Sequence, residues 1–92
     1  MLNDEEKKNL NHRLKRILGQ VEAIGRMIEE DAYCVDTLMQ VSAARGALGR
    51  VGEIVLQEHL KSCVRHALEN GDEAARDTKL DELMVIFRKY SQ

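Results

Sequence analysis

The chain of 92 residues contains no proline and no tryptophan, and aromatic residues make up only 3% of it. Proline breaks helices more strongly than any other residue, so its absence permits long uninterrupted helices. No segment shows the alternation of apolar and polar residues that is typical of a strand. The composition therefore predicts an all-α protein, and the length predicts one small domain, residues 1–92.

Long apolar runs are also absent. No segment reaches the roughly 20 apolar residues that a membrane-spanning helix needs, and the first six residues lack the apolar core of a signal peptide. We therefore expect a cytoplasmic protein without a membrane association. The chain has only two cysteines, and in the cytoplasm such a pair is more often metal-binding or redox-active than a structural disulfide.

Motifs typical of enzymes are missing as well. The sequence contains neither a glycine-rich phosphate loop nor an HExxH zinc motif. His59 and Cys63 have the residue types of a base and a nucleophile, but no third group accompanies them to orient the base. We therefore expect that the protein is not an enzyme.

The first predicted helix covers residues 4–30. Asn3 and Glu6 have the spacing of a capping box, and a turn is expected at Asp31-Ala32. The apolar residues follow steps of four and three, as in a helix packed lengthwise on another helix. Gly19 and Gly25 interrupt this helix and predict a close approach of another backbone. The apolar residues are Leu10, Leu14, Ile17, Val21, Ile24 and Ile28.

A second helix is predicted for residues 33–70 and a third for residues 78–90. The second is rich in small residues between Ser42 and Gly49, and it ends at Asn70-Gly71, where a left-handed residue is expected. A helix of this length is too long for a monomer of this size, so an antiparallel dimer of long helices is predicted. The third helix places Leu80, Leu83, Met84 and Phe87 on one face.

Charge is unevenly distributed along the chain. The net charge is −2, but six basic residues and only one acidic residue, Glu22, lie between Lys7 and Arg26. A basic stripe can attract a polyanion although the whole chain is weakly acidic, because the local potential matters more than the sum. The same stripe can also be an ordinary solvated helix face. The pattern alone leaves both interpretations open.

Cys34, His59 and Cys63 form the pattern with the clearest chemistry. Positions 59 and 63 share one face of a helix, so these two side chains could bind one metal ion. Cys34 would have to come from elsewhere in the fold or from another subunit. Two thiolates and one imidazole favour Cu(I) or Zn(II) over harder ions.

The same residues also have an ordinary interpretation. A buried cysteine often packs as a small apolar side chain, and a single histidine often lies at the surface. His66 could reach the face of Cys63, but we expect it at the surface. His12 lies among basic residues, where a contact with solvent or a phosphate is expected. From the spacing alone, a metal site and an ordinary helix face both stay open.

Several motifs resemble those of the copper-sensing repressor (CsoR) family. Residues 13–21, RLKRILGQV, resemble the family signature R-L-K-R-I-x-G-Q-V. Further matches follow in the same order at residues 27–31, 33–36, 40–43 and 58–64. The resemblance spans nearly the whole chain, and it is carried by several motifs at the expected separations.

This resemblance implies a fold and a metal site. The implied fold is an all-α antiparallel dimer with three helices per protomer and a long central helix, assembled into a tetramer. The implied Cu(I) site combines Cys34 of one subunit with His59 and Cys63 of its partner. Tyr33 and Glu82 would orient His59 by hydrogen bonding, as residues around metal ligands generally do.

The resemblance also implies a role in transcription. The apo protein would bind operator DNA without a helix-turn-helix motif. Cu(I) would release it from the operator and derepress copper-resistance genes. The expected DNA-binding residues are Arg13, Lys15, Arg16, Gln20, Arg45 and Arg50.

Related sensors of other signals differ at the ligand positions. Nickel and cobalt sensors add an N-terminal histidine, and the corresponding residue here is Leu2. Formaldehyde sensors lack the last cysteine, and persulfide sensors lack the central histidine. The resemblance therefore favours Cu(I). Three alternatives stay open: a persulfide or thiol-redox sensor that uses Cys34 and Cys63, a repressor that responds to another transition metal, and a structural oligomer without a ligand.

Overall fold

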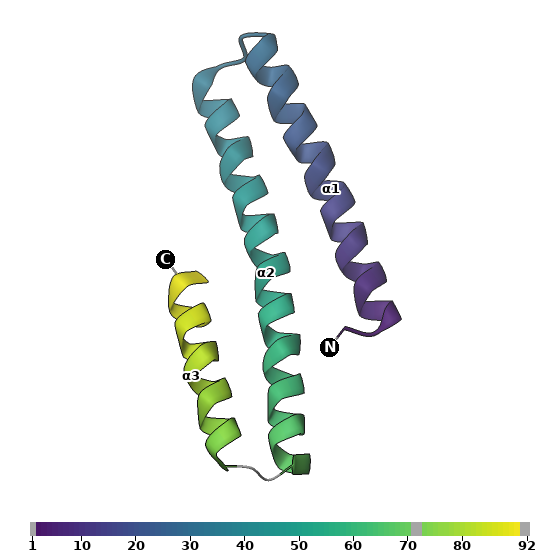
Figure 1. Cartoon of the computed structure of the whole chain (residues 1–92). Helices are drawn as coiled ribbons and strands as arrows, with labels where there is room; N and C mark the ends of the chain where they lie inside the picture. The colour runs from purple at the N-terminus through teal and green to yellow at the C-terminus, as the bar shows by residue number, and fades with distance from the viewer. Residues whose placement is uncertain (1, 71–72, 91–92) are drawn as a thin grey trace. The chain divides into compact units, whose positions relative to one another are not determined.

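The computed structural model describes residues 2–70 and 73–90, and every regular element in these two ranges is an α-helix (Figure 1). Helix α1 spans Asp4–Glu29, α2 spans Cys34–Asn70, and α3 spans Glu73–Tyr90. None of the helices within these ranges combines the length and apolar character needed to cross a membrane. The predicted all-α fold with a long central helix is confirmed.

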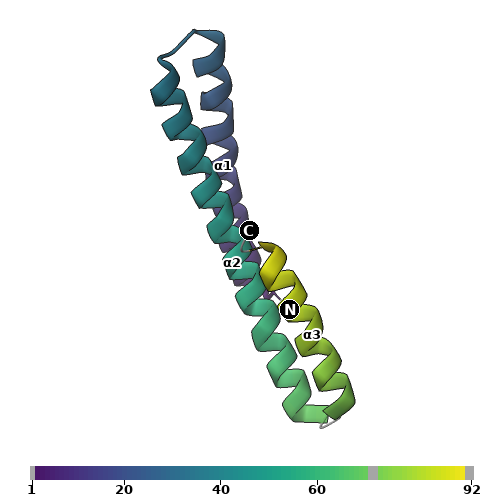
Figure 2. The same ribbon diagram turned by 90° about the vertical axis from the view of Figure 1, so that its left-hand side faces the viewer.

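The chain divides into two compact units, and the division falls inside α2. The N-terminal unit comprises residues 2–54, and the C-terminal unit comprises the residues from Val55 onward. In the N-terminal unit, α1 and the first part of α2 lie side by side and antiparallel (Figures 1 and 2). In the C-terminal unit, the last part of α2 and α3 have the same arrangement. Each unit is thus a helical hairpin.

The predicted capping box fixes the start of α1. The Oδ1 of Asn3 accepts a hydrogen bond from the Glu6 amide at 2.8 Å, and the Asn3 amide donates to Oε1 of Glu6 at 3.1 Å. The first bond gives a partner to the Glu6 amide, which has none inside the helix, and the second gives a partner to the Asn3 amide. Acidic residues occupy the first turn, where they interact favourably with the positive end of the helix.

The turn after α1 is centred on Asp31, whose φ is 56°. The Asp31 amide donates to the carbonyl of Ile28 at 3.2 Å, and the Ala32 amide donates to the carbonyl of Met27 at 2.9 Å. These two bonds define a Schellman motif, in which glycine is the commonest left-handed residue and aspartate is tolerated. The turn predicted at residues 31–32 is confirmed, and it reverses the chain between α1 and α2.

The buried residues of the N-terminal unit are seven positions apart on each of its two helices. They are Leu10, Ile17, Ala44 and Val51. Leu14, Val21 and Ile28 of the predicted apolar seam stay exposed to solvent, from 41% at Leu14 to 65% at Ile28, and Ile24 is half-buried. One hairpin therefore covers only part of the apolar face that the heptad pattern predicts.

Fewer of the described side chains are buried in the C-terminal unit. Leu83 is its one buried apolar residue among the side chains that the structure describes there, and Met84 and Phe87 are each more than half exposed. Helix α3 begins at Glu73 rather than near Thr78 as predicted. The first residues of α3 include good helix formers but no apolar pattern, so propensity extends the helix beyond the amphipathic segment.

One sequence prediction about the helices is not met inside this chain, and another concerns a residue that the structure does not describe. No atom of another helix in the described ranges comes within 4 Å of a Cβ built on Gly19, Gly25 or Gly46. The close approach predicted at Gly19 and Gly25 is therefore not made within the protomer. The end of α2 at Asn70 is confirmed, and the left-handed residue expected at Gly71 lies outside the described residues.

Candidate functional site

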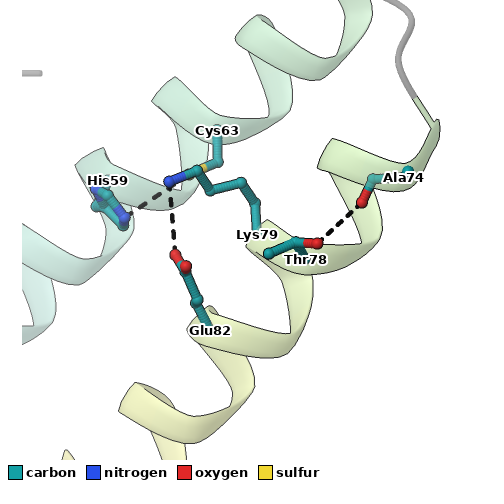
Figure 3. A network of polar contacts seen from close by, with 6 residues as sticks. All are labelled: His59, Cys63, Ala74, Thr78, Lys79 and Glu82. Atoms are coloured by element: carbon teal, nitrogen blue, oxygen red, sulfur yellow. Dashed lines mark hydrogen bonds and ion pairs between the residues drawn. The ribbon is translucent and has the colours of Figure 1, made fainter.

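His59 and Cys63 lie one helical turn apart on the same face of α2. The Sγ of Cys63 is 3.7 Å from Nε2 of His59 (Figure 3). Both residues are half-buried, and the Cys63 thiol is free rather than part of a disulfide. The predicted proximity of this pair is confirmed, and it follows from the i,i+4 spacing in a regular helix.

The distance between these two atoms fits a shared metal ion. For a zinc-like ion with a bond of about 2.3 Å to sulfur and about 2.05 Å to nitrogen, an angle of about 110–120° places the two ligand atoms about 3.6–3.8 Å apart. The observed separation of 3.7 Å falls within this interval. Because thiolate and imidazole are soft and borderline donors, the pair suits Cu(I) or Zn(II). Two ligands are thus placed for binding without a change of helix geometry.

The structure shows no third ligand beside this pair in the part of the chain that it describes. Across residues 2–70 and 73–90, no group of three or more His, Cys, Asp or Glu side chains could hold a metal ion. Cys34 is an exposed free thiol at the first residue of α2, in the N-terminal unit. Tyr33 precedes it and is 69% exposed. The participation of Cys34 and Tyr33 in a metal site therefore stays a prediction.

Glu82 lies on α3, and its side chain extends toward α2 (Figure 3). Its Oε2 is 3.5 Å from Nζ of Lys79, and both side chains are more than half exposed. Sequence reasoning overlooked Lys79, although the i,i+3 spacing from Glu82 would have indicated the ion pair. Glu82 therefore has a cationic partner on its own helix, and its contact with His59 stays a prediction.

Three of the predicted DNA-binding residues meet in one hollow of the N-terminal unit. Arg13, Arg16 and Gln20 of α1 line a hollow of about 540 Å³ together with Gln40 and Ala47 of α2. Two guanidinium groups and two amide side chains provide hydrogen-bond donors of the kind that bind phosphate oxygens. In the sequence, Gln40 belongs to the matched motif at residues 40–43, but it was not among the predicted DNA-binding residues.

One of these arginines is held by its own helix. The Nε of Arg13 donates a hydrogen bond to Oδ1 of Asn9 at 3.2 Å, and Arg13 is half-buried. This contact restricts the arginine side chain but leaves the two terminal nitrogens of the guanidinium for a further partner. Arg13 is thus oriented before any ligand binds.

The other predicted DNA-binding residues lie outside this hollow. Lys15 lines a separate surface strip of α1 together with His12, Lys7 and Lys8. Arg45 and Arg50 are exposed on α2, and Nη1 of Arg50 is 3.2 Å from Oε2 of Glu53. The six predicted residues therefore all lie in the N-terminal unit, but they do not form one cluster there.

Comparison with known proteins identifies the class to which this fold and these residues belong. Residues 6–89 match the model of the metal-sensitive transcriptional repressor family. The chain belongs to this family. Because the family consists of transcriptional repressors, the predictions of a repressor and of a protein without enzymatic activity are confirmed.

The relatives it resembles include two named copper sensors. The chain is 40% identical over 88 residues to the copper-sensing transcriptional repressor CsoR of Bacillus subtilis. This alignment covers 96% of this chain and 84% of the relative. It is 49% identical over 78 residues to the copper-sensing transcriptional repressor RicR of Mycobacterium tuberculosis, covering 85% of this chain and 80% of the relative.

Two solved structures are also similar. The copper-sensing repressor CsoR of Geobacillus thermodenitrificans, determined with Cu(I), matches with a TM-score of 0.86 and 37% identity over 100% of this chain and 93% of the other. The nickel-responsive transcriptional regulator InrS matches with a TM-score of 0.82 and 31% identity over 98% of each chain. The fold is therefore shared by sensors that are named for different metals.

Proposed function

We propose that this protein is a Cu(I)-responsive transcriptional repressor. In this proposal the apo form binds operator DNA, and Cu(I) releases the DNA and derepresses copper-resistance genes in the cytoplasm. The observation that carries the proposal is the 3.7 Å separation of Cys63 Sγ and His59 Nε2, which places two soft donors at the spacing of metal ligands. Relatives named as copper sensors support the choice of metal.

The proposed metal site spans two protomers. Residues of one helix can bind the same ion only when they are about one turn apart, because each residue adds about 1.5 Å along the axis. Cys34 precedes His59 by twenty-five positions, so the proposal takes Cys34 from one subunit and His59 with Cys63 from its partner. Three ligands, two thiolates and one imidazole, then suit the d¹⁰ ion Cu(I).

Tyr33 and Glu82 complete the proposed site by orienting His59. A metal-bound imidazole uses one ring nitrogen for the metal and donates a hydrogen bond from the other, and a carboxylate is a common acceptor for that bond. The Glu82 side chain extends from α3 toward α2, the helix of His59 and Cys63 (Figure 3). Tyr33 would act from the neighbourhood of Cys34.

The proposed DNA interface is the basic surface of the N-terminal unit. It comprises Arg13, Lys15, Arg16, Gln20, Arg45 and Arg50. The hollow lined by Arg13, Arg16 and Gln20 supports contacts to the phosphate backbone, which give an affinity that falls steeply with salt. Sequence preference would come from a few base contacts and from DNA shape.

A homodimer that pairs into a tetramer is part of the proposal. Apolar side chains on all three helices are exposed in the single chain, including Leu18, Leu38 and Met84 at 56–60%, and exposed apolar surface of this extent is typical of association sites. A metal ion bridging two subunits would favour one arrangement of the assembly over another. The coupling is reciprocal, so DNA must weaken Cu(I) binding by the same factor.

The test is an anaerobic Cu(I) titration of the protein bound to a fluorescent duplex, selected from a random pool by the apo protein. We expect anisotropy to fall as Cu(I) is added to wild type. Cys34→Ala, His59→Ala and Cys63→Ala should bind the duplex normally and fail to release it, whereas His66→Ala should respond like wild type. Release of DNA from all three ligand variants at wild-type Cu(I) concentrations would overturn the proposed site.

A nickel-responsive repressor is a second candidate, because the similar structure InrS is nickel-responsive. Ni(II) prefers more ligands, and harder ones, than a site of two thiolates and one imidazole offers. The same titration with Ni(II) in place of Cu(I) distinguishes the two candidates. A persulfide or thiol-redox sensor would instead release DNA after treatment with a sulfane-sulfur donor and without any metal.

A further inference from the structure

Lys79 and Glu82 form an ion pair close to the proposed metal ligands. Nζ of Lys79 lies 3.5 Å from Oε2 of Glu82, one turn further along α3. Figure 3 shows both side chains extending from α3 toward the segment of α2 that carries His59 and Cys63. All four residues belong to the C-terminal unit, so their arrangement is internal to one helical hairpin.

The pair engages a carboxylate of the kind that Zn(II) binds. Zn(II) takes four ligands and accepts Asp or Glu oxygen beside cysteine and histidine. Cu(I) prefers soft sulfur and nitrogen donors, so a carboxylate adds little to its binding. In the structure, His59, Cys63 and Glu82 do not make up a group that could hold a metal ion, since none is found in residues 2–70 and 73–90.

We propose that Lys79 is a specificity-determining residue: its ammonium group holds the Glu82 carboxylate in an ion pair and keeps it from serving as an oxygen ligand beside His59 and Cys63. The site then offers only thiolate and imidazole donors, and it discriminates against four-coordinate divalent ions. Lys79 contacts one oxygen, Oε2, which leaves Oε1 as an acceptor for the ring N–H of His59. This inference rests on the metal site proposed above.

The chain provides a matched control for the loss of one positive charge. Nζ of Lys61 lies 3.5 Å from Oε1 of Glu58, also with i,i+3 spacing, and the Lys61 side chain is 60% exposed compared with 58% for Lys79. Lys61 is two residues from both His59 and Cys63, which places it about 200° away around the helix. Removing its charge changes the local potential without freeing a carboxylate on the metal-binding face.

The experiment measures metal affinities of the full-length protein by chelator competition, with Zn(II) and Cu(I) as separate probes. For Lys79→Met we expect Zn(II) affinity to rise about tenfold, the lower end of effects seen for residues around metal ligands, while Cu(I) affinity changes by less than about twofold. The gain should disappear in Lys79→Met/Glu82→Gln. Lys79→Arg, which keeps the ion pair, and Lys61→Met should match wild type.

Co(II) absorption provides a readout that a general effect on stability would not change. We expect Lys79→Met to bind Co(II) with the strong visible bands of a tetrahedral site, and wild type to show weaker bands. Unchanged Zn(II) affinity in Lys79→Met, an equal rise in Lys61→Met, or a rise that persists without Glu82 would overturn the inference. If wild type binds Cu(I) normally in any of these cases, the proposed function stands and only the role of Lys79 falls. If wild type fails to bind Cu(I), both fall.

Discussion

The N-terminal and C-terminal units are both helical hairpins, but they differ in how much apolar surface one chain can bury. The N-terminal unit encloses four buried residues, two from each helix, whereas the described side chains of the C-terminal unit include one, Leu83. The N-terminal hairpin also closes with a Schellman turn at Asp31. Among the side chains that the structure describes, the first unit therefore has the larger apolar core.

The two units also carry different predicted functional residues. The predicted DNA-binding residues all lie in the N-terminal unit, and the His59–Cys63 pair lies in the C-terminal unit. In the proposed function, two of the three metal ligands therefore lie in the C-terminal unit, and Cys34 comes from the N-terminal unit of another subunit. A metal ion that bridges subunits can favour one arrangement of the assembly, because it binds that arrangement more tightly than the others.

The largest expected effect tests whether the His59–Cys63 pair of the C-terminal unit is required for metal binding but not for DNA binding. Cys63→Ala should lower Cu(I) affinity on the order of a thousandfold, because each ligand carries several kcal/mol of the binding free energy of such sites. The affinity of its apo form for DNA should stay within about twofold of wild type. Competition with a Cu(I) chelator measures the first quantity and anisotropy the second. A parallel loss of DNA binding would mean that the units do not divide the functions.

Substitutions of apolar residues on α1 test how much the N-terminal core contributes to the free energy of unfolding. Ile17→Ala should lower the free energy of unfolding by about 2–4 kcal/mol, because it opens a cavity in the N-terminal core. Leu18→Ala is the control, since Leu18 is 58% exposed in the single chain. Urea unfolding followed by circular dichroism measures both. If Leu18→Ala lowers the free energy of unfolding as much as Ile17→Ala does at high protein concentration, but less on dilution, a partner subunit covers this face.

A charge removed from the N-terminal hollow should affect only DNA binding. Arg16→Gln should weaken apo binding by about 1–2 kcal/mol per bound copy and reduce the slope of log affinity against log salt by about one. Its Cu(I) affinity should equal that of wild type. Lys61→Gln, which removes a charge in the C-terminal unit, is the control. An unchanged salt slope in Arg16→Gln would show that this hollow does not contact phosphate.

The smallest effect concerns the turn that closes the N-terminal hairpin. Asp31→Gly should raise the free energy of unfolding by about 0.5–1 kcal/mol, because glycine adopts a positive φ without the steric cost of a Cβ. Glu30→Gly, at a neighbouring residue with φ of −91°, should not stabilise the protein. Thermal unfolding of the two variants measures the difference. Destabilisation by Asp31→Gly would assign the aspartate side chain a role beyond the turn.

Local features could be predicted from the sequence with good accuracy. The capping box at Asn3, the turn at residues 31–32 and the end of α2 depend on neighbouring residues, and all three are observed. The proximity of His59 and Cys63 belongs to the same class, since a helix fixes the geometry of positions four apart. The start of α3 was misplaced because the prediction followed apolar residues and not helix propensity.

Other features could not be predicted because they depend on segments brought together by folding. The apolar seam of α1 showed which residues could be buried, but not that Leu10 and Ile17 would be covered while Leu14 stayed exposed. Gln40 joins Arg13 and Arg16 only because α2 folds back along α1. The ion pair of Lys79 with Glu82 became relevant only when the C-terminal hairpin turned α3 toward α2.

The sequence by itself determined the helical class, the helix ends set by capping and turn residues, and the pairing of two soft donors on one face of α2. These follow from interactions over one or two turns, which every copy of the sequence makes in the same way. The tertiary structure decided which apolar residues are buried, which basic residues share a hollow, and which helix faces the His59–Cys63 pair. These depend on how hairpins pack, because burial and groove formation arise between segments distant in sequence.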